Sequence, residues 1–239
     1  MQNVNKHEIL LTNKNPVSEN TVLFRFSCNE NYSFKAGQYA FFTIANKEYS
    51  DEKGNTRAFS FANSPLNKGT IEICARVNKS KFSAFLYTMN PGSILYLSDA
   101  KGDLHKFFEY SDKLVIFSGG LGITPVRSFL QDYHLINSHK SVVLFYANKN
   151  PSKAAFLDEL LHLNRLNVNL NFIPVFESHS SDNPDFVKGK IEAELISKHV
   201  SEPELYNFLI LGPPEMVNKV ESDLRNSGIQ EKNIYTEKY

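Results

Sequence analysis

The amino-acid sequence predicts two domains, a β domain followed by an α/β domain, and three observations lead to that prediction. Up to about residue 108, apolar side chains recur at every second position between glycine-containing turns. After about residue 110, short apolar runs alternate with segments of helical periodicity. The chain has 239 residues, of which 41% are hydrophobic, so it can bury a full core and is not disordered.

The first part has the pattern of half-buried strands. Residues 22–26 and 71–77 alternate between apolar positions and others. In the second segment, Glu72 and Cys74 are therefore expected on the solvent-facing side of the strand, and Ile71 and Ile73 on its buried side. Turn signals at the intervening glycines indicate an antiparallel barrel or a sandwich. A short helix is expected from about Phe82 to Met89.

The second part has the pattern of a doubly wound parallel sheet. Its apolar runs are residues 114–117, 142–146, 171–176 and 208–211. Helices are expected after Pro125, after Asn150-Pro151, and from Met216 to near Gly228. In such a sheet the strand order is 3-2-1-4-5. We therefore expect domains at residues 1–108 and 109–239.

The composition excludes several classes of function. Lys plus Arg and Asp plus Glu number 26 each, which argues against a nucleic-acid partner. Two cysteines, Cys28 and Cys74, cannot supply a four-thiolate cluster or a disulfide framework, and we expect them reduced and buried. The seven histidines form no His-Glu-x-x-His pair, so we expect no metal site.

The chain shows no targeting or membrane-spanning segment. Its first ten residues are polar and lack the apolar region of a signal peptide. The longest apolar runs, such as residues 114–117, are far shorter than the roughly 20 residues that span a bilayer. A cytoplasmic protein without a membrane span is expected.

Two glycine-containing loops follow the first and fourth strands of the parallel sheet, at residues 118–125 and 211–216. Strands one and four are neighbours at the switch point of a doubly wound sheet, where ligands bind. Glycines let a ligand approach the backbone, and a helix N-terminus offers amides to phosphate. The alternative for residues 118–125 is a tight turn that needs glycine only for packing.

Two further segments could hold phosphate in the β domain. Residues 57–60, Arg-Ala-Phe-Ser, combine a cation, a ring and a hydroxyl, whereas the alternative is a strand with an ordinary surface arginine. Residues 80–83, Ser-Lys-Phe-Ser, precede a helix, and the alternative is a plain cap by Ser80 or Ser83.

These motifs, together with the final Glu237-Lys238-Tyr239, occur in the order found in the ferredoxin–NADP reductase-like flavoproteins, which the chain resembles from Gly37 onward. The resemblance implies an antiparallel Greek-key β-barrel that binds FAD, followed by a doubly wound α/β domain that binds a pyridine nucleotide. It implies an FAD-dependent oxidoreductase that takes hydride from NADH or NADPH. Electrons then pass to a separate acceptor, a ferredoxin- or flavodoxin-type protein or a small molecule.

Three alternatives to this function remain open. They are an electron-transfer subunit of a larger complex, a flavin or ferric reductase with loosely held flavin, and a flavin-binding module without turnover. The chain also departs from the family's pattern at two positions. Leu211 stands where many relatives have Cys, and Phe59 stands where the family usually has Tyr.

The resemblance assigns roles to individual residues. Arg57 matches the pyrophosphate-binding arginine, Phe59 the ring that stacks on the flavin, and Ser60 the hydroxyl beside its reactive nitrogen. Ser60, Glu237 and Tyr239 are the expected catalytic residues. The other FAD-binding positions are Cys74, Ala75, Arg76, Ser80, Lys81, Phe82, Ser83, Thr124 and Tyr239. The positions expected to bind NAD(P)H are Gly120, Ile123, Thr124, Pro125, Gly212, Pro213, Pro214 and Met216.

Two finer expectations concern the nucleotide and the C-terminus. Residues 177–182, after the third strand, contain no Arg or Lys that could bind the 2′-phosphate of NADPH, which favours NADH, although Lys149 and Lys153 remain candidates.

Residues 233–236 are expected to form the fifth strand. Tyr239 would then cover the flavin face that nicotinamide must reach, and the alternative is a frayed tail.

Overall fold

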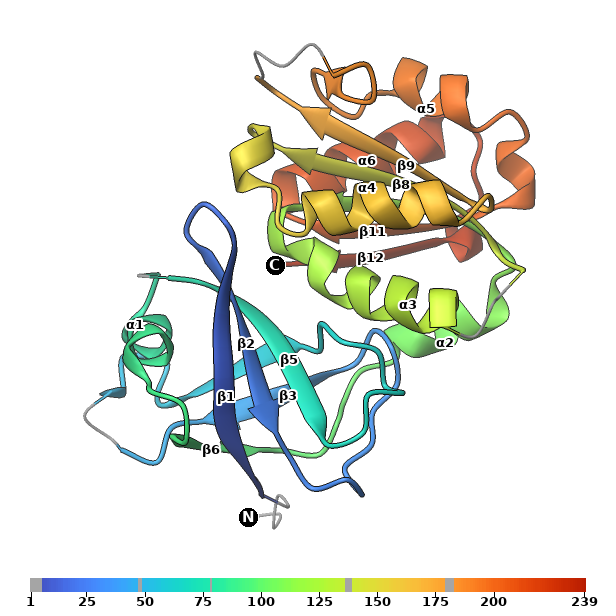
Figure 1. Ribbon diagram of the computed structural model, residues 1–239. Coiled ribbons are helices and arrows are strands. Elements are labelled where there is room, and N and C mark those ends of the chain that lie inside the picture. The colour runs from blue at the N-terminus through green and yellow to red at the C-terminus, as the bar shows by residue number, and fades with distance from the viewer. Residues whose placement is uncertain (1–5, 47–48, 78, 136–138, 179–182) are drawn as a thin grey trace. The chain divides into compact units, whose positions relative to one another are not determined.

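The computed structural model describes residues 6–46, 49–77, 79–135, 139–178 and 183–239 (Figure 1). The chain forms two compact units. The barrel unit comprises residues 1–108 and 124–135, and the parallel-sheet unit comprises residues 109–123 and 136–239. The division into functional domains at residues 108 and 109 stays a prediction.

The barrel unit is built on an antiparallel sheet with the strand order β4-β3-β6-β1-β2-β5. A bridge between Phe61, just after β4, and Ile73 of β5 joins the two ends of this order, so the sheet closes into the expected barrel rather than a sandwich. The strands are β1 (His7–Ser18), β2 (Thr21–Ser27), β3 (Tyr39–Thr43), β4 (Thr56–Ser60), β5 (Thr70–Arg76) and β6 (Ile94–Leu97).

Helices complete the barrel unit. The expected short helix is α1 (Lys81–Thr88), which buries Phe82 and Leu86 in the barrel core. Helix α2 (Leu104–Tyr110) follows the last strand, and residues 124–135 of α3 (Ile123–Leu135) belong to the barrel unit. The expected half-burial of β5 is wrong, because Glu72 and Cys74 are only 3% and 4% exposed. Arg127 of α3 binds Glu72. This helix therefore covers the face of β5 that the alternating sequence pattern predicts to be exposed.

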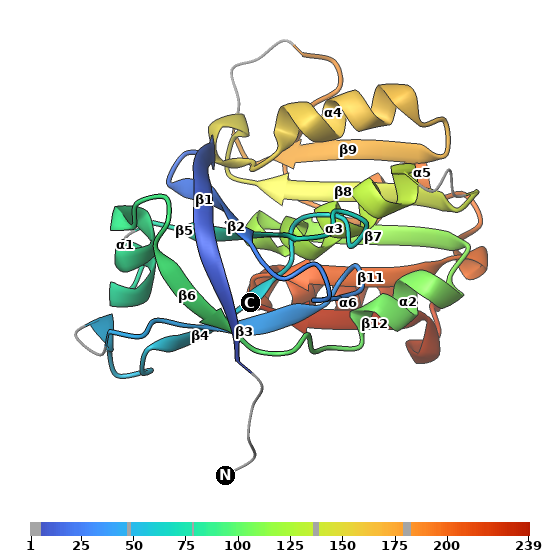
Figure 2. The same ribbon diagram turned by 60° about the horizontal axis from the view of Figure 1, so that its bottom comes forward.

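The parallel-sheet unit has the strand order β10-β9-β8-β7-β11-β12, and every neighbouring pair is parallel (Figure 2). Apart from the two-residue β10, this is the expected order 3-2-1-4-5. The fifth strand runs two residues further than expected. The strands are β7 (Lys113–Gly119), β8 (Ser141–Asn148), β9 (Leu170–Phe176), β10 (Val187–Lys188), β11 (Asn207–Gly212) and β12 (Ile234–Lys238).

Figure 1 shows α4 and α6 on opposite faces of the parallel sheet. The apolar stripe after Met216 forms α6 (Pro214–Asn226), as expected. The helix expected directly after Asn150-Pro151 begins later. Those residues open only a 3₁₀ turn, Pro151–Lys153, and extended Ala154 interrupts it before α4 (Leu157–Leu166). Helix α5 (Ala193–His199) was not predicted. Within the part of the chain that the structure describes, no helix is long and apolar enough to cross a membrane.

Candidate functional site

The structure brings together the two segments of the barrel unit that were expected to hold phosphate. The guanidinium carbon of Arg57, on β4, lies 5.6 Å from the ring centroid of Phe82 in the first turn of α1. The ring of Phe59 lies 5.8 Å from the same ring. An arginine, an aromatic side chain and a helix N-terminus therefore converge at one place, which is the set of groups that a dinucleotide pyrophosphate needs.

The two serines of this segment form a reciprocal cap on α1. Ser80 Oγ accepts from the Ser83 amide at 3.1 Å, and Ser83 Oγ accepts from the Ser80 amide at 3.0 Å. The alternative of a helix cap is therefore correct for both hydroxyls. The first helical amides, those of Lys81 and Phe82, have no carbonyl partner inside the helix, so they are the groups that could bind phosphate.

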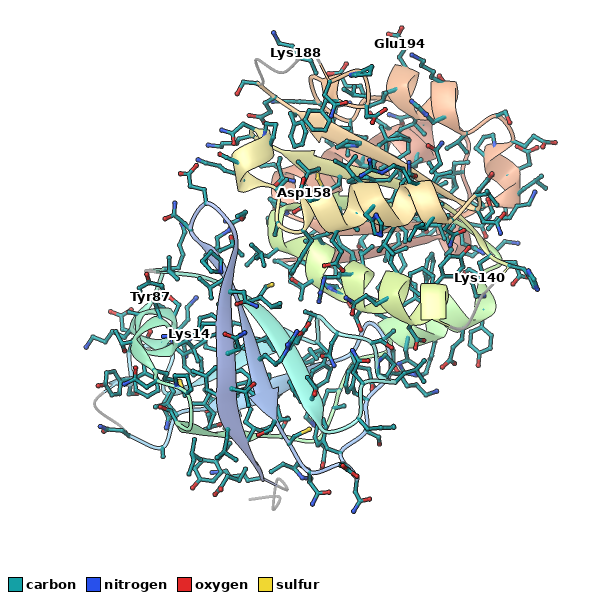
Figure 3. All side chains as sticks on the ribbon, in the orientation of Figure 1. Lys14, Tyr87, Lys140, Asp158, Lys188 and Glu194 are labelled. Atoms are coloured by element: carbon teal, nitrogen blue, oxygen red, sulfur yellow. The ribbon has the colours of Figure 1, made fainter. Side chains whose placement is uncertain are left out.

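Lys14 of β1 holds the other end of α1. Its Nζ donates to the carbonyl oxygens of Tyr87 and Met89 at 2.6 Å each, and it lies 5.7 Å from the Tyr87 ring centroid (Figure 3). A cation at the C-terminus of a helix stabilises it through the helix dipole. Because α1 is short, this contact helps to keep its N-terminal turn in place beside Arg57.

Arg57 is not an ordinary surface arginine. Its side chain is only 17% exposed and forms an ion pair with Asp51. Its Nη1 donates to the carbonyl oxygens of Lys53, Gly54 and Thr56 at 2.8–3.0 Å. The Arg57 hydrogen bond lowers the pKa of Asp51, which therefore stays ionised. Sequence reasoning missed Asp51, because an acid six residues before the arginine shows no periodic pattern.

Replacing Asp51 by asparagine is expected to strengthen FAD binding roughly two- to tenfold, because the carboxylate neutralises the cation that should face the pyrophosphate. The measurement is a fluorescence titration of the purified protein with FAD. Glu52→Gln is the matched control, since Glu52 is an exposed acid next in the chain. Equal affinities of the two variants would contradict a specific effect of Asp51.

The remaining FAD-binding candidates of the barrel unit lie on two strands. Ser60 ends β4 and stands opposite Tyr39 of β3. On β5, Cys74 and Ala75 are 4% and 3% exposed, whereas Arg76 is exposed. The FAD contact of all three residues stays a prediction.

In the parallel-sheet unit the two glycine-containing loops lie side by side, because β7 and β11 are neighbours and Ser118 stands opposite Leu211. A Cβ on Gly122 would lie 2.4 Å from the Leu211 carbonyl oxygen. A Cβ on Gly119 would lie 2.7 Å from Met216 Sδ, and one on Gly212 would lie 3.1 Å from Gly119 Cα. The alternative for residues 118–125, glycine for packing, is thus correct at Gly119 and Gly122, and Gly212 is packed as closely, so the packing itself brings the expected nucleotide loops together.

The other expected nucleotide contacts differ in their exposure. Ile123 and Pro125 are buried, and Gly120 is half-buried with a positive φ of 55°. In the second loop Pro213 and Pro214 are exposed and Met216 is half-buried. Gly120, Met216 and the two prolines are therefore the positions of this set that a nucleotide could reach directly.

Two hydroxyls near the first glycine loop have no protein partner among the described residues. They are Ser118 Oγ, in the parallel-sheet unit, and Thr124 Oγ1, in the barrel unit. Ser118 is fully buried and Thr124 is 3% exposed. Buried polar atoms are nearly always hydrogen-bonded, so each of these positions suits a ligand atom. The residues present therefore fit the cofactors that the resemblance implies.

The C-terminal residues are part of the parallel sheet. The Tyr239 amide donates to the Gly212 carbonyl oxygen at 3.0 Å, directly at the second glycine loop. The hydroxyls of Tyr235 and Tyr239 donate to the Glu237 carboxylate at 3.2 Å and 2.5 Å. The alternative of a frayed tail is therefore wrong, while the stacking of Tyr239 on a flavin stays a prediction.

Across the described ranges, no group of His, Cys, Asp and Glu side chains could hold a metal ion.

Two protein-family models match this chain. Residues 8–107 match an oxidoreductase FAD-binding domain, and residues 116–222 match an oxidoreductase NAD-binding domain. FAD and a nicotinamide dinucleotide are therefore the cofactors of these domains.

Individual relatives support the same grouping. The chain is 26% identical over 225 residues to a subunit of the Na(+)-translocating NADH-quinone reductase of Idiomarina loihiensis, covering 87% of this chain but 54% of that protein. It is 27% identical to the gamma subunit of sulfhydrogenase 2 of Pyrococcus furiosus, covering 86% and 72%. A crystal structure of a ferredoxin NADP+ reductase from Neisseria gonorrhoeae, with bound FAD and NADP, superposes with a TM-score of 0.80 at 25% identity over 98% of each chain. The chain spans about half the length of the NADH-quinone reductase subunits that it matches.

Proposed function

Because the chain belongs to the ferredoxin–NADP reductase-like flavoproteins, we propose that it is an NAD(P)H-dependent reductase that passes electrons from the nicotinamide to a separate acceptor. One observation of the structure carries this proposal furthest. Arg57, Phe59 and the N-terminal turn of α1, which are distant in the sequence, converge around the ring of Phe82. We assign residues 1–108 to FAD binding and residues 109–239 to nucleotide binding.

The chain's own residues bind and orient the two cofactors. FAD, when bound, supplies the chemistry by which a hydride from the nicotinamide becomes electrons for an acceptor. Arg57 and the amides of Lys81 and Phe82 hold its pyrophosphate. Phe59 offers a ring for stacking, and Ser60 offers a hydrogen bond at the reacting nitrogen. Orientation of the two rings is the protein's main contribution, because no strong acid or base is required.

In the nucleotide domain the two glycine loops let the dinucleotide approach the backbone closely. Gly120 and Pro125 stand at the first loop, and Gly212 to Pro214 stand at the second. Glu237, held by two tyrosine hydroxyls, pairs with Leu211 at the start of the second loop and is the acid that we assign near the flavin. Tyr239 is the ring that we expect the nicotinamide to displace.

The acceptor is the main point on which the candidate functions differ. Two of the relatives are named as subunits of larger enzymes, which favours the alternative of an electron-transfer subunit. Steady-state oxidation of NADH by the purified chain, with ferredoxin, flavodoxin, a quinone, a ferric chelate or oxygen as acceptor, separates these functions. Turnover with one of them supports an independent reductase. Flavin reduction without turnover on any acceptor would support the role of a subunit.

We expect a higher kcat/KM for NADH than for NADPH, by at least about tenfold. The 2′-phosphate of NADPH is bound by a cationic side chain at the ends of β8 and β9. There the amides of Glu177 and Ser178 donate to the carbonyl oxygens of Asn148 and Lys149. Glu177, an acid, directly follows the last residue of β9, which disfavours a 2′-phosphate at this strand end. Residues 179–182 lie outside the described residues.

Lys149→Ala and Lys153→Ala test the two remaining cations directly. If neither variant changes the kcat/KM for NADPH, neither Lys149 nor Lys153 binds a 2′-phosphate. A parent enzyme with higher kcat/KM for NADPH would contradict the preference.

A further inference from the structure

Helix α3 carries a row of polar side chains along one face. The row consists of positions i, i+3, i+4, i+7 and i+8, which lie on one side of a helix, and its members are Thr124, Arg127, Ser128, Gln131 and Asp132. The apolar periodicity of the sequence predicts this helix, but it does not predict that the polar residues form a bonded row. Within the barrel unit, most of this row is bonded to one short segment and one strand.

The row binds the segment of residues 62–64 through four hydrogen bonds. Arg127 Nη1 donates to the Ala62 carbonyl oxygen at 2.8 Å, and Ser128 Oγ donates to the Asn63 carbonyl oxygen at 2.7 Å. The amide of Ser64 donates to Gln131 Oε1 at 3.2 Å. The Ser64 hydroxyl also donates to Asp132 Oδ1 at 3.2 Å. Such a series fixes both the rotation and the height of the helix against the barrel.

Glu72 of β5 anchors the row by charge. Arg127 Nη1 donates to Glu72 Oε2 at 2.8 Å, and both side chains are less than a tenth exposed. Arg25 of β2 binds the other carboxylate oxygen from the solvent side, with its Nε at 2.7 Å and half of its side chain exposed. A buried carboxylate is costly unless it is paired, so the buried ion pair between Arg127 and Glu72 holds α3 against β5.

Thr124 is the exception in the row. It lies at the end of α3 that follows the glycine loop, and its hydroxyl is buried without a partner among the described residues. We propose that Arg127, with the rest of the row, is a positioning residue that holds Thr124 Oγ1 where it hydrogen-bonds the FAD. This inference rests on the proposed function. It adds a residue that acts on the cofactor only through Thr124.

A double-mutant cycle on the FAD dissociation constant tests this proposal. Thr124→Val should weaken FAD binding about three- to tenfold, the effect of one hydrogen bond. Arg127→Met should weaken it by the same factor, and the double variant should be no weaker than Thr124→Val alone. The circular dichroism of the bound flavin should change in the same way in all three variants. Effects that multiply would overturn the proposal, because Arg127 would then act independently of Thr124.

Arg25→Met is the matched control, because it removes the other arginine from the same carboxylate without touching α3. It should leave the FAD affinity unchanged, and a loss equal to that of Arg127→Met would overturn the proposal. If Arg127→Met does not fold, Ser128→Ala takes its place in the cycle with the same criteria. A parent protein that takes up no FAD would contradict the proposed function itself and is recognised before any variant is made.

Discussion

Replacing Arg57 by alanine is expected to weaken FAD binding about ten- to a hundredfold, the value of one charge-assisted contact. The side chain is mostly buried and lies against the first turn of α1, so the loss of its guanidinium removes a fixed positive charge from the expected pyrophosphate site. The measurement is a fluorescence titration with FAD at low and high salt. The loss should be smaller at high salt, because ions screen the interaction between the guanidinium and the phosphates.

Arg57 also holds its own loop through Asp51 and three carbonyl oxygens, and this second role must be separated from phosphate binding. Asp51→Ala removes the ion pair but leaves the guanidinium. If Arg57 binds phosphate, this variant keeps or strengthens FAD binding, as expected for Asp51→Asn. If Arg57 only supports the loop, Asp51→Ala weakens FAD binding as Arg57→Ala does, and that result would contradict the assignment.

Replacing Gly122 by alanine is expected to separate the two nucleotide loops and to lower the free energy of unfolding by about 1–3 kcal/mol. The added Cβ would lie 2.4 Å from the Leu211 carbonyl oxygen and 2.8 Å from its carbon, and these are backbone atoms that cannot rotate away. Because the loops form the expected nucleotide site, NADH affinity should fall more than tenfold. Calorimetry of NADH binding and thermal unfolding measure the two effects.

Gly228→Ala is the control for this variant. A Cβ at Gly228 meets no atom within 4 Å, but its φ of 85° is unfavourable for alanine. It should therefore lower stability through backbone strain and leave NADH affinity unchanged. If Gly122→Ala binds NADH as tightly as the parent, the close packing of the loops is not what shapes the site.

Most of the fold was predictable because it follows from local periodicity. The strands of both sheets carry their own apolar patterns, and alternating strands and helices predict a parallel sheet, for which 3-2-1-4-5 is one of the common doubly wound orders. The short helix α1 and the end of α6 were marked by caps in the sequence itself. Candidate residues at loops that follow strands were likewise visible, because position in the chain determines at which edge of the sheet they lie.

The rest depends on contacts between distant segments. Glu72 has the place of a solvent-facing residue in its strand, and only α3, more than fifty residues later, buries it. The pairing of Asp51 with Arg57 depends on how one loop folds back. The late start of α4 depends on extended Ala154, a conformation that the Asn-Pro signal does not specify. A sequence pattern cannot show such partners before the chain has folded.

The central claim is that this chain binds FAD and passes hydride from a nicotinamide to it. The most direct measurement is anaerobic mixing of the FAD-loaded protein with NADH, and then with NADPH, while the flavin absorbance is followed. We expect NADH to bleach the flavin absorbance completely in a single turnover, and NADPH to bleach it more slowly. If the protein retains FAD but keeps the oxidised flavin spectrum with both nucleotides, it does not pass hydride from a nicotinamide to FAD.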